Sequence, residues 1–333
     1  MDDTSHRPRV DRRTAIGLAA LALADFPVGA EAQSAPTPNT ETIPLWPGVP
    51  PGGEGLSFAP ETVNVGAPNG PPDRHLFSIL RPELAVFRPA APDGSAILIA
   101  PGGGYSYEAI DNEGNDPAVY FSAKGTTAFV LTYRLPYDGW KNSAGVPLQD
   151  AQRAMRLIRA MGPLHYGIAP DRVGVLGFSA GGHVAALLAT KFETQTYAPV
   201  NDADKTDARP SFAALLYPVI TMRPPYAHES SCEKLLGRNA SLPLRAAYSA
   251  ELLVAADTPP SFLCVATDDP DVAIDNSFMM FGSLKAKNVG AELHTFEKGG
   301  HGFGLGDPHL PNSQWPELFW RWGASRGYFR AQS

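Results

Sequence analysis

The chain has 333 residues, of which 44% are hydrophobic and 18% charged, so it can bury a substantial core. The net charge is −7 and no lysine- or arginine-rich block is present, which argues against a nucleic-acid surface. Two cysteines are too few for a disulfide scaffold or a four-cysteine zinc site, and no apolar run is long enough to span a bilayer. With 32 glycines and 33 prolines, we expect a loop-rich, soluble globular protein.

Residues 1–32 carry the parts of an export signal. Arg12 and Arg13 precede an apolar run of small residues at 15–24, and Ala30-Glu31-Ala32 offers a cleavage site. Paired arginines beside an alanine-rich run indicate the twin-arginine route. We therefore predict a cleaved signal and a periplasmic or secreted bacterial protein. The alternative is an ordinary terminus that contains two arginines by chance.

The polar, proline-bearing segment 33–42 is predicted to be a linker, and residues 43–333 a single domain. Apolar runs predict strands, and apolar residues at helical spacing predict helices between them. Continuously apolar strands separated by helices favour a mostly parallel sheet with helices on both faces, an α/β fold. The predicted strands are 96–100, 126–133, 171–178, 212–220, 261–267 and 291–297, and the predicted helices are 148–161, 180–190, 274–288 and 315–325.

Two segments, 191–210 and 221–260, interrupt this alternation. Both are polar and rich in proline, and both follow predicted strands or the helix after one. Insertions of this kind form active-site loops or small lids. We therefore expect a small loop and helix insertion over the site.

The segment Gly177-Phe178-Ser179-Ala180-Gly181 matches G-x-S-x-G between a predicted strand and a predicted helix. A serine at this sharp turn is exposed above the sheet edge, and the helix N-terminus stabilises negative charge on a substrate oxygen. Two other glycine-rich turns are excluded by residue type, because the segment lacks both the G-x-G-x-x-G of dinucleotide-binding proteins and the G-K-[ST] of a P-loop. We therefore predict that Ser179 is a nucleophile.

A nucleophilic serine needs a histidine base, and the base needs an acid. His301 lies in a glycine-rich loop directly after the last predicted strand, where catalytic groups gather in α/β sheets. For the acid, Asp269 is the first choice and Asp268 the second, because both follow the preceding strand. His183, just past the serine turn, is expected to be packed in the helix. His294, inside a predicted strand, is expected to be structural.

The oxyanion of the tetrahedral intermediate needs hydrogen-bond donors. The backbone N–H of Ala180, directly after the nucleophile, can supply one. Gly103 and Gly104 follow an early strand in Pro101-Gly102-Gly103-Gly104-Tyr105, where glycines let the backbone approach a ligand closely. We expect these three residues to form the oxyanion hole.

The set PGGGY, GFSAGGH, TPPSFLCVATDDPDV and ELHTFEKGGHGFGLG resembles the α/β-hydrolase superfamily. Within it, these segments and the opening IPLWPGVPPG are similar to the bacterial acetylxylan esterase-like (esterase/lipase) family over residues 43–306. The resemblance implies a serine carboxylesterase acting on acetyl or feruloyl esters of plant polysaccharides, with Ser179, His301 and Asp269 as its triad. One departure is Ala273 after Val272, where that family usually has proline, and it keeps Asp268 open as the acid.

The expected substrate is therefore an acylated oligosaccharide or a small ester, with no cofactor and no metal. A broad-range small-ester carboxylesterase is the nearest alternative. A non-catalytic carbohydrate-binding protein on a hydrolase scaffold is the alternative from another class, and it would be expected to lack a triad member. A serine peptidase of this fold normally carries an extra propeller or cap domain, and the expected mature chain leaves no room for a propeller.

The roles of five further side chains are left open between two alternatives each. Tyr105, Tyr107 and Trp140 are placed either to stack on a sugar or to anchor loops. Cys264 is expected to be a buried thiol, and its pairing with Cys232 is left open.

Overall fold

The computed structural model describes residues 41–330, so the predicted export signal and most of the predicted linker lie outside the described residues. The linker ends earlier than predicted. Strand β1 (Thr42–Pro44) begins inside it and pairs with β4 (Glu83–Phe87). Glu41 forms an ion pair with Arg88 at 2.9 Å. Polarity suggested a linker here, but these residues are held by partners more than 40 positions away.

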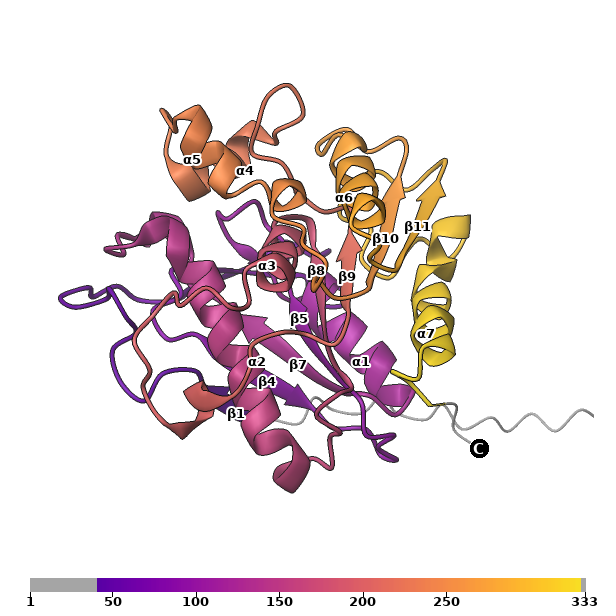
Figure 1. The fold of residues 1–333 in the computed structure, drawn as a ribbon, viewed down its shortest axis with the longest axis horizontal. Helices are drawn as coiled ribbons and strands as arrows, with labels where there is room; N and C mark the ends of the chain where they lie inside the picture. The colour runs from indigo at the N-terminus through magenta and orange to yellow at the C-terminus, as the bar shows by residue number, and fades with distance from the viewer. Residues whose placement is uncertain (1–40, 331–333) are drawn as a thin grey trace, which may run out of the picture. The chain divides into compact units, whose positions relative to one another are not determined.

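An eight-stranded sheet has the order β1-β4-β7-β5-β8-β9-β10-β11 (Figure 1). The pairs from β7 to β11 are parallel, whereas β4 is antiparallel to both of its neighbours. Because parallel strands end at the same edge, the loops that follow them lie close together. The remaining bounds are β5 (Ala96–Ala100), β7 (Thr127–Thr132), β8 (Val173–Phe178), β9 (Ala213–Leu216), β10 (Ser261–Ala266) and β11 (Ala291–Phe296).

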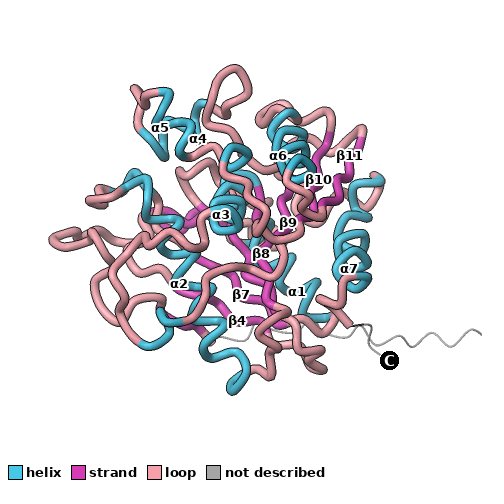
Figure 2. The backbone as a smooth tube through the Cα atoms, viewed as in Figure 1, coloured by secondary structure: helices cyan, strands magenta, loops and turns pink. Residues whose placement is uncertain are grey.

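Helices cover both faces of this sheet, as Figures 1 and 2 show. One core holds side chains of α2 (Val146–His165), α3 (Ser179–Thr190) and α6 (Asp275–Ala286), and the other holds those of α1 (Asp116–Ala123) and α7 (Trp315–Ser325). Along β5, Leu98 belongs to the first core and Ile97 to the second. This alternation explains why the strand is apolar throughout.

The predicted insertion 221–260 contains α4 (Glu229–Leu236) and α5 (Leu242–Ala247), which lie side by side at one edge in Figure 1. A second, antiparallel sheet of β2 (Glu61–Asn64), β3 (Arg74–Phe77) and β6 (Glu108–Ala109) was not predicted, because its strands are short and lack an apolar run. The short 3₁₀ helices are Pro136–Asp138, Ser143–Gly145, Asp202–Lys205, Ala250–Leu252 and Pro311–Gln314, and Asp111–Asn115 forms a π-helical turn.

The predicted strands and helices are confirmed, with ends that differ by a few residues. One correction concerns the strand expected over 212–220. It ends at Leu216, because Tyr217 adopts a φ of +36°, which no strand accommodates. Helix α1, between two predicted strands, was missed. In the part of the chain that the structure describes, no helix has the length and apolarity to cross a membrane.

Candidate active site

Ser179 lies at the sharp turn between β8 and α3, with a φ of +50°. A non-glycine residue held in this region stores strain, and such residues cluster at functional sites. The neighbouring Gly181 explains why the motif requires a glycine. A Cβ atom on Gly181 would overlap the carbonyl oxygens of Ala100 and Pro101, at the end of β5. The turn therefore packs directly against the loop that follows β5.

Three of the predicted site residues are joined by hydrogen bonds. His301 Nε2 lies 2.8 Å from Ser179 Oγ, and His301 Nδ1 lies 2.7 Å from Asp269 Oδ2. The three residues follow β8, β10 and β11, whose carboxyl ends meet at one edge of the sheet. This arrangement has the geometry that lets a histidine remove a proton from a serine while a carboxylate orients the ring.

The choice between the two aspartates is decided by geometry. The Asp269 side chain is 1% exposed, and its Oδ1 accepts hydrogen bonds from the N–H groups of Asp271 and Val272, both at 2.9 Å. The turn thus holds the carboxylate even though Ala273 replaces the proline of the related family.

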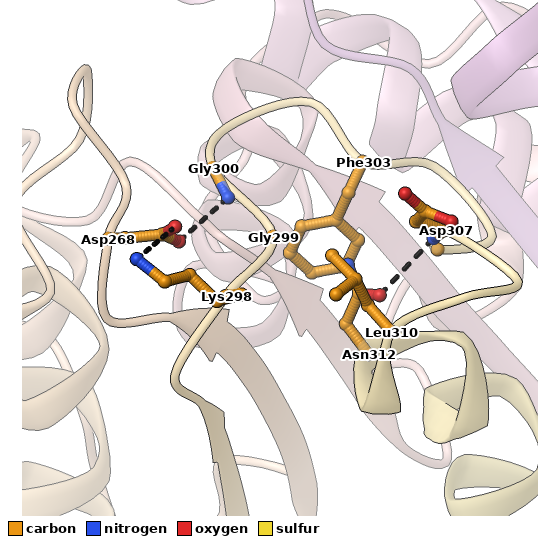
Figure 3. Close-up of a pocket in the computed structure, with 9 residues that line it drawn as sticks. Asp268, Lys298, Gly299, Gly300, Phe303, Asp307, Leu310 and Asn312 are labelled. Carbon is orange, nitrogen blue, oxygen red and sulfur yellow. Dashed lines mark hydrogen bonds and ion pairs between the residues drawn. The ribbon is translucent and has the colours of Figure 1, made fainter.

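Asp268 has different partners, as Figure 3 shows. Its carboxylate accepts a hydrogen bond from the Gly300 N–H at 2.8 Å and lies 3.7 Å from Lys298 Nζ. With Lys298 and Phe303 it lines a cavity of about 530 Å³ that neither Ser179 nor His301 lines. Asp268 therefore supports the loop of His301 rather than its ring.

The Asp269 contact changes the proton affinity of His301. Burial of the imidazole lowers its pKa, but the hydrogen bond and charge of Asp269, with the charges of Glu113 and Asp271, outweigh burial, so the pKa of His301 lies above its usual 6.5. A base of this strength is suited to accepting the serine proton near neutral pH.

The predicted oxyanion donors surround Ser179. Gly103 and Gly104 line one cavity together with the serine, and Ala180 occupies the first turn of α3, whose N–H groups have no partner within the helix. No described residue accepts a hydrogen bond from the N–H of these three residues. Gly103 has a φ of +127°, and a Cβ there would overlap the Tyr107 carbonyl. The loop therefore requires glycine at this position.

The cavity beside Ser179 has a volume of about 380 Å³ and a largely polar lining. Asp73, His75 and Tyr107 lie on one part of its wall, and His228 and Ser230, at the start of α4, on another. The imidazole of His75 stacks on the Tyr107 ring with centroids 4.0 Å apart. The full lining is Asp73, His75, Gly103, Gly104, Ser106, Tyr107, Ala109, Asn112, Glu113, Ser179, His228, Ser230, Asp271, His301 and Gly302.

Of the three aromatic residues with two readings, only Tyr107 reaches this cavity. Tyr105 is fully buried, and its hydroxyl lies 2.6 Å from His183 Nδ1. Trp140 is 4% exposed beneath the Arg134 guanidinium. Tyr105 and Trp140 are therefore internal packing residues.

His183 is buried, as predicted, and its Nε2 lies 2.7 Å from the Tyr248 carbonyl. Desolvation lowers its pKa to about 4, so the ring is neutral, with Nε2 donating to that carbonyl.

Cys232 and Cys264 are free and buried, so they do not form a bridge. Among residues 41–330, no cluster of three or more His, Cys, Asp or Glu side chains could hold a metal ion.

Sequence reasoning missed Glu113, a buried carboxylate that lines the cavity beside Ser179. It also missed His75 and His228, which line the same cavity. Glu113 and His75 belong to elements that the sequence did not predict, the π-helical turn and β3, whereas His228 lies at the start of α4 in the predicted insertion, where no motif marks it. The only local signal for Glu113 is an acidic residue shortly after the glycine loop, and that signal does not distinguish it from a solvated turn.

Residues 85–284, more than half of the chain, match the BD-FAE family. An acetylxylan esterase of Xylanibacter ruminicola is 31% identical over 67% of this chain and 44% of its own length. Endo-1,4-beta-xylanase B of Butyrivibrio fibrisolvens is 34% identical over 62% of this chain and 32% of its own length. The matched region thus spans less than half the length of these curated relatives.

Among solved structures, an acetyl ester-xyloside bifunctional hydrolase of Caldicellulosiruptor lactoaceticus is similar with a TM-score of 0.73 and 33% identity. The match covers 89% of this chain and 100% of that one. These similarities confirm the predicted α/β-hydrolase fold, and the chain belongs to the BD-FAE family.

The packing of Gly181 predicts that Gly181→Ala is destabilising. The added methyl group meets backbone carbonyls that cannot rotate away, and overpacking of this kind costs about 1–3 kcal/mol or more. Gly282→Ala is the matched control, because Gly282 lies within α6 and a Cβ there meets no atom within 4 Å. It should stabilise the helix by about 0.5–1 kcal/mol. Urea unfolding measures both changes, and equal stabilities for the two variants would contradict the packing.

Proposed function

We propose that this member of the BD-FAE family is a serine carboxylesterase that removes acetyl groups from plant polysaccharides such as xylan. The observation that carries the proposal is the hydrogen-bonded series Ser179–His301–Asp269 beside three unpartnered N–H donors. The similarity to an acetylxylan esterase and to an acetyl ester-xyloside hydrolase supports the substrate class.

In the proposed reaction, Ser179 Oγ attacks the ester carbonyl while His301 Nε2 takes its proton. Asp269 holds the ring through Nδ1 and stabilises the imidazolium that forms. The carbonyl oxygen becomes an oxyanion, which the N–H groups of Gly103, Gly104 and Ala180 can bind. The sugar alcohol then leaves with the proton from His301. Water attacks the acyl-enzyme by the same route, releasing the acid and regenerating Ser179.

The polar cavity lining favours a hydroxyl-rich leaving group. Asp73, Asp271 and His228 offer hydrogen-bond partners that an aryl or alkyl chain would not use. An acetyl or a feruloyl group on such a sugar would both place the carbonyl at Ser179. A broad-range small-ester carboxylesterase remains the alternative, because simple esters also fit a cavity of about 380 Å³. A non-catalytic carbohydrate-binding role is disfavoured, since such a protein would not need the complete series.

Ser179→Ala should lower hydrolysis of acetylated xylan oligomers by roughly 10⁴–10⁶-fold, because the nucleophile is lost. The measurement is product analysis on acetylated and feruloylated xylan oligomers and on 4-nitrophenyl acetate, with a fluorophosphonate probe for the serine. Cleavage of the aryl ester alone would favour the broad-range carboxylesterase. A wild-type protein that neither hydrolyses esters nor reacts with the probe would overturn the proposal.

Asp269→Asn should lower kcat by about 10⁴-fold, because the amide no longer stabilises the imidazolium. Asp268→Asn is the matched control and should stay close to wild type, since its carbonyl oxygen can still accept from Gly300. Equal losses in the two variants would contradict the assignment of the acid.

Catalysis requires neutral His301, whose pKa is raised above 6.5, so wild-type kcat/KM should fall on acidification with a midpoint above pH 6.5.

We also propose that residues 1–32 are a twin-arginine export signal and that the mature enzyme is periplasmic or secreted. Arg12, Arg13 and the small-residue segment that ends at Ala32 support this. Expressed in full length in a bacterium with this route, the chain should appear outside the cytoplasm beginning at Gln33, as N-terminal sequencing would show. Replacing both arginines with lysine should retain it inside. Export of the lysine variant at the wild-type level would exclude the twin-arginine route.

A further inference from the structure

Glu113 is a buried carboxylate that the proposed reaction does not use. It lies on the π-helical turn Asp111–Asn115 and is 3% exposed. Its Oε2 accepts a hydrogen bond from the Gly102 N–H at 2.8 Å, and its Oε1 accepts one from the Tyr217 hydroxyl at 2.9 Å. Gly102 directly precedes the predicted oxyanion donors Gly103 and Gly104. One end of this carboxylate therefore holds the loop that follows β5.

Tyr217 extends the contact to the loop of His301. Its hydroxyl oxygen accepts a hydrogen bond from the Gly304 N–H at 3.0 Å, and its ring packs edge-on against the His301 ring with centroids 5.1 Å apart. Tyr217, directly after β9, has a left-handed backbone, as Ser179 and Tyr105 of the glycine loop also do.

The His301 loop is held at two further points. The Asn112 amide, next to Glu113, donates to the Gly302 carbonyl at 2.9 Å. The Trp315 indole donates to the Gly304 carbonyl at 2.9 Å. One short turn thus binds both loops that surround Ser179.

The chemistry of these partners favours the ionised form of Glu113. The Gly102 N–H can only donate, and the Tyr217 hydroxyl, whose oxygen is occupied by Gly304, has its proton free to donate. Both carboxylate oxygens therefore face donors. Burial raises the pKa of Glu113 above its usual value, although these two hydrogen bonds and the nearby His301 oppose the rise. The negative charge of Glu113 also contributes to the raised pKa of His301.

We propose that Glu113 is a positioning residue, whose carboxylate fixes the oxyanion-donor loop relative to His301 and whose negative charge stabilises the imidazolium. This inference rests on the proposed function. It assigns Tyr217 as the side chain through which Glu113 acts on the His301 loop. Both residues act through others and neither needs to touch the substrate.

The test compares Glu113→Gln with wild type in kcat, KM and the pH dependence of kcat/KM on 4-nitrophenyl acetate. Glutamine keeps the shape but removes the charge and one acceptor. We expect kcat to fall by about 10–100-fold, as for a small displacement of catalytic groups, with KM changed little. Without the negative charge the pKa of His301 falls, so the acid limb of kcat/KM should move to lower pH. A purely structural role would lower activity without moving that limb.

Glu108→Gln is the matched control, because Glu108 is equally buried and lies five residues away. Its Oε1 accepts from the Tyr133 N–H at 2.6 Å, and burial raises its pKa well above the usual value, which favours the neutral form. The same substitution there should leave the acid limb in place. Tyr217→Phe removes the hydrogen bonds to Glu113 and from Gly304 but keeps the Glu113 carboxylate, so it should lower kcat without moving the limb.

Wild-type kinetics in Glu113→Gln, or a loss without a shift of the acid limb, would overturn the proposal. If Glu113→Gln does not fold, Tyr217→Phe decides the positioning role, and an unchanged kcat in that variant would overturn it. Failure of the proposed function itself is recognised separately, because wild type would then neither hydrolyse the ester nor react with the fluorophosphonate probe. Hydrolysis by wild type together with an unaffected Glu113→Gln variant would reject this inference alone.

Discussion

The close contact between the serine turn and the end of β5 is the constraint on which the site depends. Gly181 lies against the Ala100 and Pro101 carbonyls, so no side chain fits between the strand-to-helix turn and the glycine loop. Since β5 and β8 are neighbours in the sheet, this contact places Ser179 and the N–H groups of the glycine loop at one edge. The left-handed backbone of Ser179 is maintained by the packing on both sides of the turn.

Buried carboxylates then organise the loops around this contact. Asp269 is held by the N–H groups of its own turn and is bonded to His301, whereas Glu113 is held by Gly102 and Tyr217. A buried charge is tolerated only when its oxygens have hydrogen-bond partners. Asp269 thereby fixes the ring of His301, and Glu113 fixes the backbone at Gly102, directly before Gly103 and Gly104.

The substrate side of the site is built from elements outside the central sheet. His75 comes from the small antiparallel sheet and His228 from the start of α4 in the insertion. Both are absent from the motifs that define the serine turn. The groups that can distinguish one ester from another thus belong to peripheral segments, while the groups proposed to perform the chemistry belong to the ends of the parallel strands.

The sequence by itself determined the alternation of strands and helices, the serine turn and the positions of Ser179, His301 and the glycine loop, because these depend on local spacing and on the steric needs of glycine. It left Asp268 and Asp269 unresolved and missed Glu113, Tyr217 and the second sheet. Only the tertiary structure decided these. The two adjacent aspartates differ in their partners, because Asp269 faces the His301 ring and Asp268 faces the Gly300 N–H. A buried glutamate cannot be told from a solvated one in the sequence, because its partners Gly102 and Tyr217 are brought together only by the fold. Hydrogen bonds between residues that are distant in the sequence, such as Glu113 and Tyr217, leave no periodic pattern in the chain.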